Sequence, residues 1–99
     1  MGRYMGTTVN DVIVESYVKL PIPIQAVQWN DDQNSYFKLI KMGAIPHIEI
    51  EGDGSLYIKT LEGRMKCPIG SYVIKGVEGE FYACNEEIFN KTYKKVENV

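Results

Sequence analysis

Three side chains carry the soft metal ligands of this 99-residue chain: His47 is its single histidine, and Cys67 and Cys84 are its two cysteines. Tetrahedral zinc takes thiolate and imidazole ligands, with a carboxylate or a water completing the set. The two cysteines border a predicted hairpin, so their thiols could meet and bind a structural zinc ion with His47. The chain has no Cys-x-x-Cys or His-x-x-x-His spacing, so two ordinary packed cysteines remain the alternative, and redox chemistry is disfavoured.

His47 is also the one side chain whose unperturbed pKa suits proton transfer near neutral pH. No Ser-x-x-Lys or Gly-x-Ser-x-Gly signature accompanies it, and an exposed strand histidine is the alternative interpretation. The glycine-rich segments 52–54 and 76–79 lack the Gly-Lys-Ser/Thr of a phosphate-binding loop and are predicted to be hairpin turns. A small metal-dependent enzyme or ligand binder centred on His47, Cys67 and Cys84 is therefore one candidate function.

Composition narrows the class of protein. Hydrophobic residues make up 44% of the chain, which is enough for one small domain, and the formal net charge is −2. The 11 basic residues are scattered among 13 acidic ones, so the basic stripe that direct nucleic-acid binding requires is missing despite the many aromatic residues. No apolar run reaches the roughly 18 residues of a membrane span, and no signal peptide is recognisable. We expect a cytoplasmic protein without a structural disulfide.

Residues 1–8 are predicted to be a flexible arm, and residues 9–99 a single domain. Alternating Val12, Val14 and Val18 make 9–19 a candidate strand. A second strand is predicted over 24–29, with Val27 and Trp29 on one face. The helical spacing of apolar residues predicts a helix over 31–42, with Asn30 as its N-cap and Gly43 at its C-terminus.

From His47 onward the pattern is one of short hairpins: strands over 47–51, 55–60 and 64–67, with turns at 52–54 and 62–63. Ile48 and Ile50 should face inward, as should Leu56 and Ile58. A last hairpin over 71–84 with a two-residue loop would place Lys75 opposite Glu80, Ile74 opposite Phe81 and Ser71 opposite Cys84. Asn85 is expected to cap a short helix that ends near Tyr93, and the predicted aromatic core is Trp29, Phe37, Phe81 and Phe89. The fold class is α+β: a small antiparallel meander sheet of hairpins with one main helix and a short C-terminal helix.

Several segments carry a resemblance to a known family. Residues 71–93 resemble the tail of small phage and prophage proteins of the PGDYG type, whose function is uncharacterised. Residues 23–29, which end in Gln28-Trp29, resemble the first strand of that family, and residues 56–65 resemble its hairpin before the tail. The family's Pro-Gly-Asp-Tyr reads Ile-Gly-Ser-Tyr over 69–72 here, Ala83 replaces a proline, and Cys67 is not expected. The resemblance implies a divergent phage-encoded protein acting in a bacterial host cell.

Without a catalytic constellation, we interpret the chain as a non-enzymatic protein-binding module, monomeric or homodimeric. The resemblance and the acidity favour a host protein as partner, such as a nucleic-acid-processing enzyme, and suggest an anti-defence inhibitor of a host nuclease such as a CRISPR effector. A virion or assembly component is a further alternative. Exposed tyrosines on a sheet face often anchor a partner, so the predicted contact residues are Tyr57, Tyr72, Tyr82, Glu49, Glu51 and Glu80.

Overall fold

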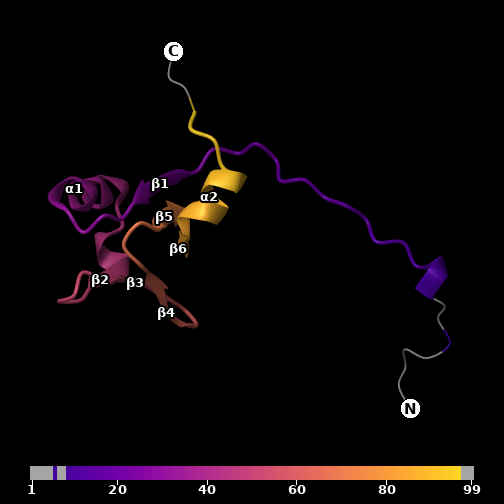
Figure 1. The fold of residues 1–99 in the computed structure, drawn as a ribbon, viewed down its shortest axis with the longest axis horizontal. Coiled ribbons are helices and arrows are strands. Elements are labelled where there is room, and N and C mark those ends of the chain that lie inside the picture. The colour runs from indigo at the N-terminus through magenta and orange to yellow at the C-terminus, as the bar shows by residue number, and fades with distance from the viewer. Residues whose placement is uncertain (1–5, 7–8, 97–99) are drawn as a thin grey trace.

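The computed structural model describes residue 6 and residues 9–96, and within them it confirms the α+β class (Figure 1). The elements along the chain are η1 (Val9–Asp11), β1 (Gln25–Gln28), α1 (Gln33–Met42), η2 (Ile45–His47), β2 (Ile48–Ile50), β3 (Leu56–Thr60), β4 (Gly63–Cys67), β5 (Tyr72–Lys75), β6 (Phe81–Cys84) and α2 (Glu86–Thr92). No helix among these residues is long and apolar enough to cross a bilayer.

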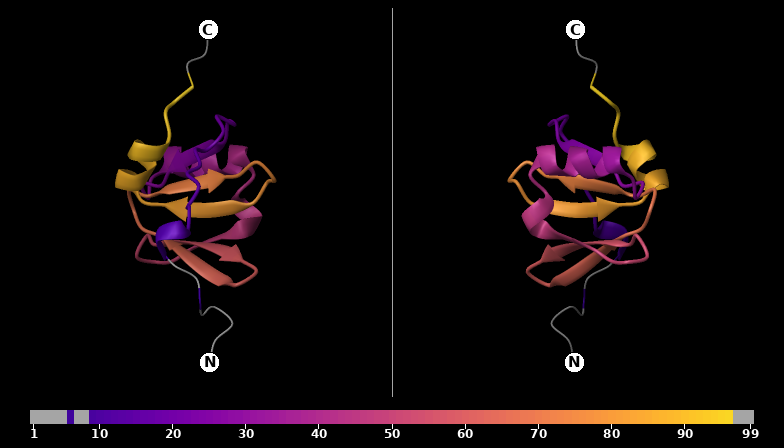
Figure 2. Two further views of the ribbon diagram at one scale, coloured as in Figure 1. Left: turned by 90° about the vertical axis from the view of Figure 1, so that its right-hand side faces the viewer. Right: turned by 90° about the vertical axis from the view of Figure 1, so that its left-hand side faces the viewer.

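The strands form two antiparallel three-stranded sheets, in the orders β1-β5-β6 and β2-β3-β4, where the sequence predicted a single meander sheet. The sheets meet where β4 runs beside β6, and Met65 Sδ there accepts a hydrogen bond from the Ala83 N–H at 3.1 Å (Figure 2). The core lies between their inner faces and α1, and consists of Val27, Trp29, Leu39, Met42, Ala44, Ile48, Leu56, Ile58, Cys67, Val73 and Phe81. Ile48, Leu56 and Ile58 are buried as predicted, whereas Ile50, at the end of β2, is exposed.

Helix α1 starts two residues later than predicted, and Asp32 caps it instead of Asn30. The Asp32 carboxylate accepts the Ser35 N–H at 2.8 Å, and the Ser35 hydroxyl returns toward the Asp32 backbone, so the two residues satisfy each other. These hydrogen bonds to Ser35 lower the pKa of the Asp32 carboxyl. At the other end Gly43 has φ +84°, which confirms the predicted glycine C-cap.

The predicted register of the last hairpin is wrong by one residue. Lys75 pairs with Phe81 and Ile74 with Tyr82, because the loop holds three residues and not two. The Gly76 N–H bonds the Glu80 carbonyl at 2.7 Å, and Gly79 takes φ +85°. A type I turn followed by a residue with positive φ is the usual three-residue loop, and Gly79 supplies that residue without steric cost.

Trp29 ties the two sheets together. Its backbone N–H bonds the Ser71 carbonyl at 2.8 Å beside β5, and its buried indole Nε1 donates to the Gly54 carbonyl at 2.8 Å in the β2–β3 turn. Gly54 is itself buried with φ +89°, and a Cβ there would collide with the Asp31 carboxylate. The turn that was predicted only as a hairpin connection therefore also receives the indole of Trp29.

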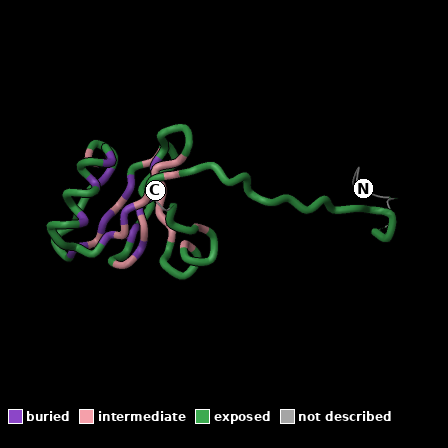
Figure 3. Tube along the Cα trace, turned by 90° about the horizontal axis from the view of Figure 1, so that it is seen from above, coloured by how far each residue is buried: buried purple, intermediate pink, exposed green. Residues whose placement is uncertain are grey.

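The segment before β1 does not form the strand predicted over 9–19. Within residues 9–23 only the short η1 is regular, and this stretch extends away from the sheets with its residues exposed (Figure 3). The packed part of the protein therefore begins near Ile24. The predicted flexible arm, residues 1–8, lies outside the described residues except for Gly6, which is exposed.

Candidate interaction surface

The two cysteines lie in different surroundings. Cys67, at the end of β4, is fully buried in the core between the sheets. Cys84, at the end of β6, alternates with Phe81 and Ala83, which pack against that core, so its side chain projects from the opposite face of the sheet with Tyr82. His47 closes the turn η2 and is exposed, with its ring centroid 4.9 Å from that of Phe81.

This placement gives the zinc hypothesis no support. Across residues 9–96 no group of three His, Cys, Asp or Glu side chains is close enough to hold a metal ion. Burial raises the pKa of the Cys67 thiol to about 12. Both cysteines are free thiols, and Cys67 is a packed residue of the core.

Three of the predicted contact residues come together on the outer face of the β2-β3-β4 sheet. Glu49 pairs across the strands with Tyr57. Arg64 on β4 reaches over the sheet to bind the carboxylates of Glu49 at 3.1 Å and Glu51 at 3.3 Å, and its guanidinium lies 4.0 Å from the centre of the Tyr57 ring. Arg64, which sequence reasoning did not select, is thus the residue that organises this cluster.

The charge of this face differs from the expectation of an acidic surface. Lys59 and Lys66 point to the same side as Tyr57 and Arg64, since Lys66 pairs with Tyr57 and Lys59 with Arg64. Three basic residues thus stand beside two carboxylates, both of which bind Arg64. The face is a mixed, solvated surface and not an acidic patch.

Tyr72 and Tyr82 lie elsewhere, half-buried beneath α2. The Tyr72 ring stacks on Phe89 at 3.7 Å between centroids with an interplanar angle of 8°, and Phe89 in turn lies 4.9 Å from Tyr93. The Tyr82 and Tyr93 hydroxyls are 3.4 Å apart, and this hydrogen bond, with burial, raises the pKa of Tyr82 to about 12. These two tyrosines hold the C-terminal helix on the sheet. Most of the side-chain surface that they were expected to offer a partner is therefore used within the protein.

Glu80 is occupied within the hairpin loop. Its carboxylate accepts the Glu78 N–H at 3.0 Å and folds over Gly76. The six predicted contact residues therefore divide among three places: the outer face of one sheet, the underside of α2 and the β5–β6 turn. They do not form one continuous surface.

Helix α1 carries the exposed apolar surface that sequence reasoning missed. Its buried stripe is Ser35, Leu39 and Met42, and Phe37, predicted to be core, is instead 55% exposed. Tyr36, Phe37 and Ile40 share one flank of the helix at spacings of one, three and four residues, and all three are exposed. Lys38 and Lys41 occupy the other flank. We call the set Tyr36, Phe37 and Ile40 the apolar flank of α1.

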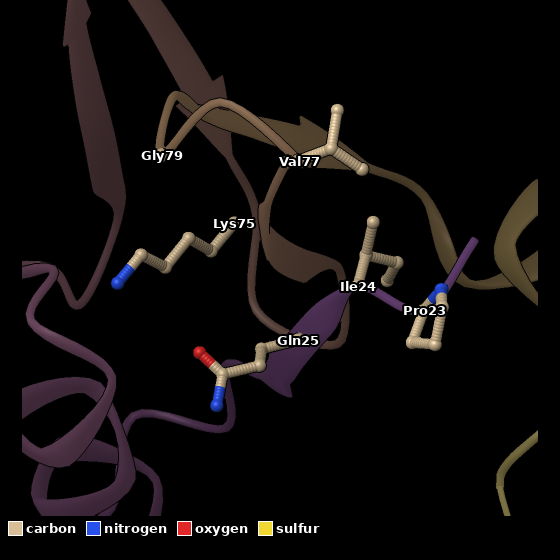
Figure 4. Close-up of a pocket in the computed structure, with 7 residues that line it drawn as sticks. Pro23, Ile24, Gln25, Lys75, Val77 and Gly79 are labelled. Atoms are coloured by element: carbon tan, nitrogen blue, oxygen red, sulfur yellow. The ribbon is translucent and has the colours of Figure 1, made fainter.

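Two open hollows lie on the described part of the surface. One, of about 450 Å³, is open to solvent and is lined by Pro23, Ile24, Gln25, Lys75, Gly76, Val77 and Gly79 (Figure 4). Its polar side chains are an amide and an ammonium, and the ammonium of Lys75 lies 3.4 Å from the Met42 carbonyl. A second, of about 380 Å³, is a groove between β1 and the lysine flank of α1. Neither brings a carboxylate, an imidazole or a thiol to its walls.

No family model matches the chain, and neither a curated protein nor a solved structure matches it.

Proposed function

We propose that this protein is a non-enzymatic protein-binding module and that the apolar flank of α1 is its contact surface. The observation that carries the proposal is the side-by-side exposure of Tyr36, Phe37 and Ile40 on a helix whose ends are fixed by the Asp32 cap and by Gly43. Two aromatic rings and a branched aliphatic side chain on a rigid support are the residue types that anchor protein partners.

The partner we propose is a bacterial host protein, such as a nucleic-acid-processing enzyme of antiviral defence and in particular a CRISPR effector. The support for this narrower proposal is the resemblance of the sequence to phage proteins and its formal charge of −2. The metal-dependent alternative has no observation in its favour, because no group of three potential metal ligands gathers among the described residues.

The test is capture of the partner by the full chain from lysates of phage-susceptible bacteria, followed by a direct assay of DNA cleavage by the captured nuclease. The double variant Phe37→Asp/Ile40→Asp should lose at least about tenfold in captured partner, since each substitution buries a charge in an apolar contact. Val77→Asp is the matched control, because Val77 is equally exposed in the β5–β6 turn.

If the double variant still captures the partner, α1 is not the contact surface. If Tyr57→Ala loses the partner, the contact surface is the outer face of the β2-β3-β4 sheet. If no host protein is captured from the lysates of several hosts, the proposed class of partner is refuted.

A further inference from the structure

The extended segment of residues 12–20 has the composition of a β-strand but pairs with nothing in the described chain. Six of its nine residues are large and apolar, and their exposed fractions run from 52% to 91%: Val12, Ile13, Val14, Tyr17, Val18 and Leu20. Valine, isoleucine and tyrosine favour strands, and an exposed run of this kind is a template for pairing with another chain. We call residues 12–20 the arm.

The backbone just after the arm directs it away from its own domain. Leu20 and Ile22 each precede a proline, which keeps them extended and disfavours the tight turn of a hairpin. The Ile22 N–H bonds the Leu20 carbonyl at 2.8 Å across Pro21, and the Lys19 ammonium lies 4.4 Å from the centre of the Tyr93 ring beyond α2. The base of the arm is thus fixed while the rest extends outward, as Figure 1 shows.

The domain itself has an unpaired strand edge of the right kind. β1 bonds only β5, and the bond from the Trp29 N–H to the Ser71 carbonyl sets the alternation along the pair. The backbone N–H and C=O groups of residues 25, 27 and 29 point toward β5. Those of Ala26 and Gln28 therefore point away from β5, toward the free edge of the sheet. The groove between β1 and α1 runs along this edge, and Lys38 and Lys41 line it.

We propose that the arm of one copy adds to the free edge of β1 in a second copy of this chain, so that two chains exchange arms around a two-fold axis. Antiparallel pairing centred on Pro21 places Val14 opposite Gln28, Ser16 opposite Ala26 and Val18 opposite Ile24. Between residues 14–18 and 24–28 this register makes the even-numbered residues the hydrogen-bonded ones on both strands, and Leu20 and Ile22 stay outside the ladder because the Ile22 N–H already bonds the Leu20 carbonyl. Pro21 and Pro23 are odd-numbered, so the N–H groups they lack are not needed by the new ladder.

The same register gives charge complementarity. Glu15 lies opposite Val27 and therefore projects to the face of β1 that borders α1, where Lys38 and Lys41 line the groove. Val14, Tyr17 and Val18 of each arm lie within this register, and their exposed apolar surface would be partly removed from water on pairing.

The first test is the mass of the full chain in solution by sedimentation equilibrium. We expect twice the 11.3 kDa of one chain. The variant Val14→Asp/Val18→Asp should raise the dissociation constant at least about 100-fold, because each charge would enter an apolar contact. The matched control is Val77→Asp/Val96→Asp, since both control residues are exposed outside the arm; it should remain dimeric. Because all four positions are exposed, circular dichroism should show the same fold in every variant.

A charge exchange then tests the register. Glu15→Lys should weaken the dimer, and Lys38→Glu/Lys41→Glu in the same chain should restore it. Any of three results would overturn the proposal: a wild-type monomer at every soluble concentration, an arm variant that stays dimeric, or a control that dissociates equally. A wild-type monomer would leave the arm to a different partner. The inference is independent of the proposed function, because Phe37→Asp/Ile40→Asp should leave the dimer intact.

Discussion

Raising the pH above about 9 is expected to destabilise the fold through the buried thiol of Cys67. Burial raises the pKa of this thiol from 9.0 to about 12, so the folded state keeps its proton in a range where the unfolded chain releases it. Because the folded state holds this proton more tightly than the unfolded chain does, a rise in pH shifts the equilibrium toward the unfolded state. The contribution of Cys67 to stability is therefore complete below pH 9 and declines between pH 9 and about 12.

The size of the effect follows from the two pKa values. Each pH unit between them costs about 1.4 kcal/mol, so moving from about pH 8 to about pH 10.5 should lower the free energy of unfolding by about 2 kcal/mol at most. A loss of that size is a large part of the stability of a domain this small, which is on the order of 5–10 kcal/mol.

Urea denaturation followed by the fluorescence of Trp29, the single tryptophan and a buried one, provides the assay. The control is Cys67→Ala, which has no thiol at this position but retains other titrating groups, including Tyr82 with its raised pKa. Wild type should lose about 2 kcal/mol more than the control over this pH range. Equal pH dependence of the two proteins, or rapid reaction of Cys67 with a thiol reagent in the native protein at neutral pH, would refute the reasoning and reopen the case for a thiolate ligand.

Three further substitutions test the fold. Asp32→Ala should lower the free energy of unfolding, measured by urea denaturation, by about 1 kcal/mol through loss of the α1 cap, while Asn30→Ala should be neutral. The reverse order would mean that Asn30 is the cap, as expected from sequence. Ile58→Ala should cost about 2–5 kcal/mol by leaving a cavity in the core, against under about 1 kcal/mol for Ile50→Ala at the exposed edge, and similar costs would mean that both side chains are buried. Gly79→Ala should cost about 1 kcal/mol because φ is positive there, and an unchanged midpoint would contradict the three-residue loop.

The candidate site was only partly predictable. The sequence led to Tyr57, Glu49 and Glu51 as surface residues because they alternate with apolar positions, and alternation is a local property of a strand. It did not lead to Arg64, whose role depends on β4 lying beside β3. The flank of α1 was missed because Phe37 was predicted to be core, although the fold buries Leu39 of this helix and leaves Tyr36, Phe37 and Ile40 exposed.

Sequence alone determined the elements whose signals lie within a few residues of one another: the helix that ends at Gly43, the Asn85 cap of α2, the buried face of Leu56 and Ile58, and hence the α+β class. Tertiary structure alone decided that Cys67 lies between the sheets while Cys84 lies on the outer face of the β1-β5-β6 sheet, that Tyr72 and Tyr82 support α2, and that the strand-like arm has no partner strand among the described residues. Backbone geometry and capping act over one or two turns of chain. Which faces are covered depends on contacts between residues far apart in sequence, and those contacts form only when the two sheets and α1 pack together.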